Sequence, residues 1–140
     1  IWEKARKKEI EIEMDAEDGL EEILILRDPK WLCESLINVL DNAVKYSPVG
    51  STVTIRAATT VSFLRLEVKD EGIGIPRENY HKVFQRFYRG EAPLVQKEEG
   101  SGVGLYLARK IIEGHNGTIS LDARRMTKEP GSVFVIQLPL

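Results

Sequence analysis

The alternation of apolar and polar side chains along the chain predicts where strands and helices lie. Alternation predicts strands over residues 9–14, 52–58 and 63–70, and strands are also expected over 22–27, 117–123 and 132–138. Helical spacing predicts a helix from about residue 29 to residue 46, begun by Asp28 and Pro29, and another over about 102–114. A short aromatic helix is expected over 78–88. Because helices and hairpins mix in this order, the pattern predicts an α/β (α+β) two-layer sandwich with helices on one face of a mixed sheet.

Size and composition favour one domain over residues 1–140, since a chain of 140 residues can bury one sizeable core. Twenty basic residues face 22 acidic ones, so no charge excess indicates a nucleic-acid partner. The apolar runs are far shorter than the roughly 20 residues of a membrane span, and no secretory signal is found. The single cysteine, Cys33, follows an apolar helical pattern and is expected in the core, and a cytosolic setting suits it.

The predicted helix over residues 29–46 carries a polar stripe. Its apolar positions nearly encircle it, so we expect the helix to be largely buried. Asn38, Asn42 and Lys45 share one face at spacing i, i+4, i+7, and Tyr46 lies one step further round. The stripe is either a solvated edge or a polar site. In a polar site an amide oxygen would complete a Mg²⁺ shell and Lys45 would neutralise phosphate charge.

A carboxylate ends the predicted strand over residues 63–70. Asp70 shares the period of two with Leu66 and Val68, so it lies on the apolar face. Either Asp70 caps the following turn through backbone amides, or it accepts a hydrogen bond from an exocyclic amine such as that of adenine. Gly72 and Gly74 follow and let a flat ligand approach the backbone.

Three alternating glycines precede or open the helix predicted over residues 102–114. Gly100, Gly102 and Gly104 either form an anion site at a helix start or serve as a loop hinge. The stretch lacks the Gly-Lys-Ser/Thr ending of a P-loop. It also lacks the third glycine of a dinucleotide fingerprint, because Leu105 stands there.

Taken in order, these stretches resemble the ATP-binding catalytic domain of sensor histidine kinases, whose fold is shared with gyrase B, MutL and heat-shock chaperone ATPases. "NVLDNAVKYSP" is similar to the N box, "DEGIGIP" to the G1 box, "VFQRFYRG" to the F box and "GSGVGL" to the G2 box. The resemblance covers nearly the whole chain. It implies the Bergerat ATP-binding fold, with a mixed five-stranded sheet and about three helices on one face.

The resemblance implies ATP and Mg²⁺ as cofactors and assigns the phosphate side of the site. Asn42 would be the metal ligand, and Asn38 and Lys45 would meet the phosphates. Arg86 would reach the γ-phosphate from the F box, so the implied catalytic residues are Asn38, Lys45 and Arg86.

The resemblance also assigns the adenine pocket and the lid. The implied adenine-side residues are Tyr46, Asp70, Gly72, Gly74, Ile75 and Ser132, the last acting through water. The residues implied at the helix start are Gly100, Gly102, Val103, Gly104 and Leu105. Residues from about 89 to 101 would form a mobile lid over ATP.

One departure from the gyrase-type pattern narrows the implied reaction. Those relatives carry a glutamate that activates water at the position of Asn38, and an amide cannot take a proton from water at neutral pH. The resemblance therefore implies transfer of the γ-phosphate to a histidine on a separate dimerisation domain. Neither His81 nor His115 has the acceptor pattern, and both are interpreted as structural.

The resemblance also implies which partners the chain has, and two alternative functions stay open. A response regulator would be served indirectly, and the chain itself is expected to be monomeric. It begins without Met, so we expect a cytoplasmic fragment of a longer, membrane-anchored parent protein. The alternatives are a gyrase- or chaperone-type ATPase and a non-catalytic nucleotide-binding regulatory module.

Overall fold

The computed structural model describes residues 2–16, 29–85 and 104–139. The strands in these ranges are β1 (Glu11–Ala16), β2 (Thr52–Thr59), β3 (Phe63–Lys69), β4 (Thr118–Leu121) and β5 (Val133–Pro139). The α-helices in the same ranges are α1 (Trp2–Lys7), α3 (Pro29–Lys45), α5 (Gly104–Gly114) and α6 (Ala123–Met126). A 3₁₀ turn, η1, covers Arg77–Asn79. None of the helices in the described ranges combines the length and apolarity of a membrane span.

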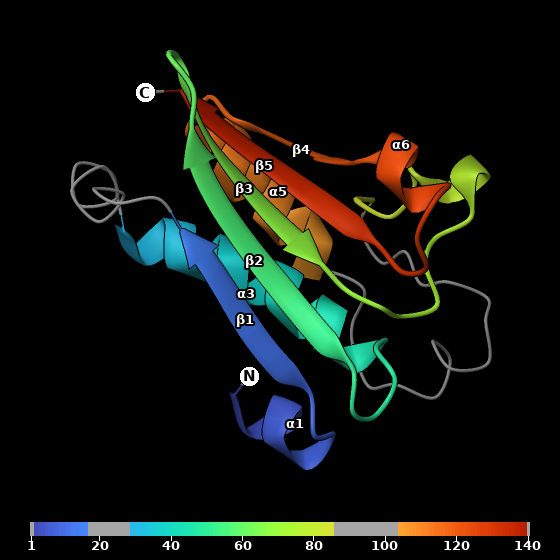
Figure 1. Ribbon diagram of the computed structural model, residues 1–140. Helices are drawn as coiled ribbons and strands as arrows, with labels where there is room; N and C mark the ends of the chain where they lie inside the picture. The colour runs from blue at the N-terminus through green and yellow to red at the C-terminus, as the bar shows by residue number, and fades with distance from the viewer. Residues whose placement is uncertain (1, 17–28, 86–103, 140) are drawn as a thin grey trace.

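The strands form one mixed sheet in the order β1-β2-β3-β5-β4. The pair β1–β2 is parallel, and the remaining neighbours are antiparallel. Figure 1 shows α3 and α5 behind this sheet, on the same face, and the two helices pack against each other. The two-layer arrangement with a mixed five-stranded sheet is therefore confirmed. The short helices α1 and α6 add to the two long ones.

The core lies between the sheet and these two helices, as strand alternation requires. Fully buried side chains come from each layer: Val53, Leu64, Val68, Phe134 and Leu138 from the sheet, and Val39, Ala43, Val44, Ala108 and Ile112 from the helices. The other face of β2 and β3 carries polar side chains. The sequence pattern thus places one face of β2 and β3 in the core and leaves their other face free for charge, whereas β5 is buried on both faces from Val133 to Ile136.

The prediction of a largely buried helix over residues 29–46 was wrong for one side of α3. Cys33 is exposed, and Trp31 and Ile37 keep 48% and 47% of their surface accessible. The buried positions of α3 form a stripe that includes Leu32 and Val39, and Cys33 lies outside it. Counting apolar residues overestimated burial because α3 contacts the sheet and α5 on only part of its circumference.

The aromatic helix predicted over 78–88 was also wrong for its described part. After η1 the backbone continues in turns, with bonds such as Lys82 N–H to the Asn79 carbonyl and Gln85 N–H to the Lys82 carbonyl. Three-residue spacing of this kind does not propagate an α-helix. The segment is fixed by side chains instead, since Phe84 is buried edge-on against Phe134 at 6.0 Å between ring centroids. The strand predicted over 22–27 and the start signal at Asp28 lie outside the described residues.

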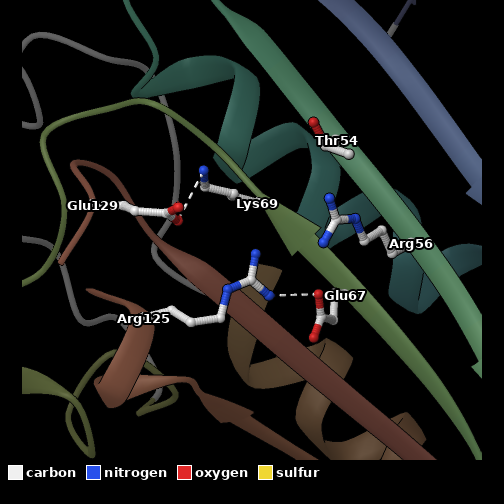
Figure 2. Close-up of a pocket in the computed structure, with 6 residues that line it drawn as sticks. All are labelled: Thr54, Arg56, Glu67, Lys69, Arg125 and Glu129. Atoms are coloured by element: carbon white, nitrogen blue, oxygen red, sulfur yellow. Dashed lines mark hydrogen bonds and ion pairs between the residues drawn. The ribbon is translucent and has the colours of Figure 1, made fainter. Parts of the chain in front are cut away.

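The open face of the sheet carries an ion-pair cluster that ties α6 to β3. Glu67 on β3 accepts hydrogen bonds from Arg125 Nη1 at 2.6 Å and from Arg65 Nη2 at 2.8 Å. Lys69 pairs with Glu129 at 2.9 Å just beyond α6. Figure 2 shows Glu67, Arg125, Lys69 and Glu129 among the side chains that line a hollow, and the volume of this hollow is about 300 Å³. Each charged side chain of the ion-pair cluster has an oppositely charged neighbour. The cluster therefore holds the β4–β5 connection, which contains α6, against β3.

Replacing Glu67 by Gln tests this cluster. Burial alone would raise the pKa of Glu67, but the hydrogen bonds from Arg125 and Arg65 outweigh burial and hold its pKa below the usual 4.5. Because the folded pKa is lowered, the stabilisation is present above pH 4.5 and is lost as the pH falls through the folded pKa. We expect Glu67→Gln to lower the free energy of unfolding by about 1–2 kcal/mol at pH 7, measured by urea unfolding.

The control is Glu113→Gln, which removes the more exposed Arg109–Glu113 pair on α5. That change should alter stability by less than about 0.5 kcal/mol. Equal effects of the two substitutions, or a Glu67 effect that persists undiminished at pH 3, would contradict the assigned role of the cluster.

Candidate functional site

Asp70 directly follows β3, and its side chain is only 4% exposed. Its Oδ1 accepts hydrogen bonds from the backbone N–H of Gly72 at 2.9 Å and of Ser132 at 3.0 Å. Its own N–H donates to the Ser132 carbonyl at 2.9 Å. The inward position predicted for Asp70 is therefore observed, and so are the turn-capping bonds that the sequence left as an alternative.

The second carboxylate oxygen of Asp70, Oδ2, accepts neither of these two backbone hydrogen bonds. Both amide bonds go to Oδ1, and within the described ranges no donor reaches Oδ2. No enclosed side-chain oxygen or nitrogen in those ranges lacks a partner, so Oδ2 must retain some accessible surface. Capping the turn thus leaves one oxygen available to a ligand.

Burial raises the pKa of Asp70 from 3.8 to about 6, although the two amide bonds from Gly72 and Ser132 oppose the shift. A carboxylate held by two donors yet costly to ionise is unusual for a residue that only caps a turn. The combination of a buried acid, an accessible oxygen and a raised pKa is typical of a binding or catalytic group.

Three glycines bring the backbone close to this carboxylate. A Cβ on Gly131 would overlap the Asp70 carbonyl, and one on Gly72 would overlap the Tyr46 carbonyl at the end of α3. Gly131 and Gly74 have φ of +92° and +73°, and Gly74 lies against Gly131. Gly131 was not predicted from the sequence, although its place directly before Ser132 in a turn-rich stretch was an available signal.

The polar stripe predicted on the first long helix lies beside the start of the second. Asn38, Asn42 and Lys45 are half-buried on α3. Oδ1 of Asn38 is the nearest heavy atom, at 3.9 Å, to a Cβ built on Gly104, the first residue of α5. The start of an α-helix leaves its first backbone N–H groups without intrahelical partners and carries the positive end of the helix dipole. The structure therefore brings a polar helix face and an anion-favouring helix start together.

The remaining predicted site residues divide by position. Ile75 and Leu105 are half-buried and pack against the core, and Tyr46 is half-buried just after α3. Ser132 is buried and meets Asp70 through its backbone rather than its hydroxyl. The other predicted residues, Arg86, Gly100, Gly102 and Val103, lie outside the described residues, as does the proposed lid over residues 89–101.

The two histidines of the chain have different surroundings. Nδ1 of His115 lies 2.8 Å from the Ile111 carbonyl, one turn earlier on α5, and must donate because a carbonyl only accepts. His81 is exposed. The bond made by His115 is an ordinary helix-end contact, which agrees with its interpretation as structural.

The hollow in Figure 2 is separate from these groups. Its lining side chains, including Arg56 and Arg125, lie on the open face of the sheet, whereas α3 and α5 cover the other face. It contains none of the residues predicted for nucleotide binding. The candidate site is therefore assembled from the end of β3, the C-terminal half of α3 and the start of α5.

Replacing Asp70 by Asn tests the cost of this buried acid. Asn retains the oxygen that accepts from Gly72 and Ser132 but cannot ionise. Because the folded pKa lies above the unfolded value, Asp70 lowers stability progressively as the pH rises from about 4 through 6. The difference in unfolding free energy between Asp70→Asn and the unmodified chain should thus grow in favour of Asn by roughly 2–3 kcal/mol between pH 4 and pH 7.

Urea unfolding of both chains at the two pH values measures this difference. All other titrating groups are common to the two chains and cancel. A difference that does not change with pH would show that Asp70 is not a buried acid of this kind.

Comparison with known proteins places these features in a family. A family model described as "Histidine kinase-, DNA gyrase B-, and HSP90-like ATPase" matches residues 27–140. The chain is 36% identical to the sensor-like histidine kinase SenX3 of Mycobacterium tuberculosis over 135 residues, 96% of this chain and 32% of that protein. It therefore spans about a third of the length of that curated relative.

Solved structures agree with the sequence matches. The mycobacterial sensor histidine kinase MprB superposes with a TM-score of 0.79 at 30% identity, covering 99% of this chain and 89% of that one. The histidine kinase ThkA, in complex with the response regulator protein TrrA, superposes with a TM-score of 0.73 at 26% identity, covering 99% of this chain and 36% of that one. The chain belongs to the family of histidine kinase-, DNA gyrase B- and HSP90-like ATPases.

Proposed function

We propose that the chain is the catalytic domain of a sensor histidine kinase, which binds Mg²⁺–ATP and donates the γ-phosphate to a histidine on a separate dimerisation domain. Membership in an ATPase family implies ATP binding. The relatives that are most informative here, SenX3, MprB and ThkA, are all histidine kinases. The observation that carries the proposal is the buried Asp70, whose Oδ1 is held by two backbone amides while Oδ2 stays accessible.

Oδ2 of Asp70 would accept a hydrogen bond from the exocyclic amine of adenine. Gly72 and Gly74 keep side chains away from the ring, and Tyr46 and Ile75 supply half-buried surface beside it. Ser132 would support the site by fixing the Asp70 carboxylate through its backbone N–H. A ligand amine that replaces water at Oδ2 offsets part of the cost of keeping this carboxylate ionised.

The phosphates would lie between α3 and the start of α5. Asn38 faces Gly104, which with Leu105 opens α5, and Lys45 shares the helix face of Asn38 by its spacing i, i+7. Backbone N–H groups at the α5 start favour an anion, and Lys45 would add a point charge. Arg86, Gly100, Gly102 and Val103 remain predictions for the same region.

The residues present fit a Mg²⁺ ion held mainly by the ligand. No group of three or more His, Cys, Asp or Glu gathers within the described ranges, so these residues offer no all-protein cage. The half-buried amide of Asn42 supplies one oxygen of the type that completes a shell of phosphate and water oxygens. When bound, Mg²⁺ would neutralise charge on the phosphates.

The chemistry of Asn38 favours transfer over hydrolysis. An amide cannot act as a general base at neutral pH, so the site positions ATP without activating water at this residue. The acceptor imidazole nitrogen would form a bond to the γ-phosphorus as the bond to the bridging oxygen breaks, with ADP as the leaving group. A response regulator would then be the next acceptor, by analogy with the ThkA complex with TrrA.

Phosphotransfer in two parts tests this proposal. The chain mixed with Mg²⁺–ATP and the histidine-bearing dimerisation domain of the same parent protein should phosphorylate that domain, detected as acid-labile, alkali-stable phosphate. The chain alone should hydrolyse ATP negligibly. Asp70→Asn should remain folded by circular dichroism but lose at least about 100-fold in ATP affinity, because Asn presents a donor where the amine needs an acceptor.

Each outcome has a clear meaning. Brisk hydrolysis by the chain alone would replace the kinase proposal with a gyrase- or chaperone-type ATPase. Tight ATP binding with no transfer to the added domain would leave a regulatory nucleotide-binding module. Failure of the unmodified chain to bind ATP in calorimetry would overturn the proposal altogether.

A further inference from the structure

The N-terminal helix α1 lies outside residues 27–140, yet it packs against the helix that carries the polar stripe. Ala5 is 3% exposed and Ile10 is 6% exposed, and both belong to the hydrophobic core. The Lys8 carbonyl accepts from the Gly50 N–H at 2.9 Å, which ties α1 to the connection after α3. Figure 1 shows α1 at the end of the sheet where β1 and β2 begin. The helix is thus a fixed part of the domain.

A carboxylate one residue before Asn42 links α1 to the proposed phosphate cation. Oδ1 of Asp41 lies 2.9 Å from Lys4 Nζ on α1, and Oδ2 lies 3.0 Å from Lys45 Nζ one turn later on α3. Each oxygen therefore holds one ammonium group. Lys45 and Asp41 are only 21% and 26% exposed, whereas the Lys4 side chain is 57% exposed, so the row of three charges is partly desolvated at its α3 end.

The carboxylate of Asp41 attracts both lysines, because each ammonium group lies within 3.0 Å of one of its oxygens. Since Lys4 fixes one oxygen, the other oxygen has a defined direction for Lys45.

A second lysine of the same segment fixes the last turn of α3. Lys8 Nζ donates to the carbonyl of Val44 at 3.1 Å and to that of Lys45 at 2.7 Å. These carbonyls are among the groups that a helix end leaves unsatisfied, and a cation there is favoured by the helix dipole. The end of α3 also contacts the proposed adenine region, because the Tyr46 carbonyl, one residue after the helix, packs on Gly72.

A neighbouring lysine on α1 provides a contrast. Lys7 pairs with Glu3 on the same helix at 4.0 Å, and both side chains are more than 70% exposed. Lys4 and Lys7 thus share a short helix and a charge, but only Lys4 contacts α3. Comparing substitutions of Lys4 and Lys7 therefore separates the effect of the Asp41 contact from the general effect of removing a lysine.

We infer that Lys4 and Lys8 are positioning residues for ATP. Lys4 acts through Asp41 to hold the Lys45 ammonium toward the phosphates, and Lys8 fixes the α3 turn that carries Lys45. The inference rests on the proposed function, since it takes Lys45 as a phosphate-binding group. It extends the nucleotide site to a segment that does not touch the nucleotide.

This arrangement predicts a loss confined to the phosphate part of the ligand. Lys4→Ala frees one oxygen of Asp41 and loosens Lys45, so Mg²⁺–ATP should bind about fivefold more weakly. Adenosine has no phosphates and depends on the Asp70 end of the site, so its affinity should not change. A merely structural role for Lys4 would weaken both ligands alike.

Calorimetry with Mg²⁺–ATP and NMR titration with adenosine measure the two affinities in the 140-residue chain. Four chains are compared: unmodified, Lys4→Ala, Lys4→Arg and the control Lys7→Ala. Lys4→Arg should restore ATP binding, and Lys7→Ala should match the unmodified chain for both ligands. In an Asp41→Asn background, which itself weakens ATP binding, Lys4→Ala should cause no further loss, because the shared carboxylate is gone.

The contradicting outcomes are distinct. Unchanged or tighter ATP binding in Lys4→Ala, equal losses for ATP and adenosine, or an additive loss in the Asp41→Asn background would overturn the inference while leaving the proposed function intact. Absence of ATP binding by the unmodified chain would overturn the proposed function and, with it, this inference.

Discussion

At the end of β3 a carboxylate is buried to 4% exposure, and two backbone N–H groups converge on one of its oxygens. Burial raises the pKa of this carboxyl group to about 6, because the enclosed position disfavours its charged form. The backbone around this group is tightly packed. A Cβ on Gly131 would overlap the Asp70 carbonyl, and a Cβ on Gly72 would overlap the Tyr46 carbonyl. A stable fold does not need such a group at this point, whereas the proposed ATP site does, since the accessible oxygen would accept a hydrogen bond from the adenine amine.

The positions of the other site elements depend on the segments that pack around Asp70. Gly72 packs on the last turn of α3, so the position of the polar stripe depends on the turn after β3. Asn38 on that stripe faces Gly104 at the start of α5, which joins the proposed adenine and phosphate regions. On the open face, the Glu67–Arg125 pair holds the connection that delivers Ser132 to Asp70. The Glu67–Arg125 ion pair on the open face of the sheet thus supports the hydrogen bond from Ser132 to Asp70.

Much of the fold and part of the site could be predicted from the sequence because they depend on local periodicity. Alternation located the described strands to within a few residues and placed Asp70 on the buried face. Burial around α3 could not be predicted, since whether Cys33 faces a neighbour depends on which elements pack there. The contact of Lys4 with Asp41 was also hidden, because 37 residues separate them and no short-range pattern marks the pair. Arg86 and the lid remain predictions.

Nucleotide selectivity is the most direct test of the role given to Asp70. ATP presents an amine at the purine 6-position, whereas inosine triphosphate presents a carbonyl there, and the two share the same ribose and phosphates. If Oδ2 of Asp70 accepts from the adenine amine, calorimetry should show inosine triphosphate binding at least about 100-fold more weakly than ATP, because two acceptors would face each other. Equal affinities for the two nucleotides would contradict this account of the site.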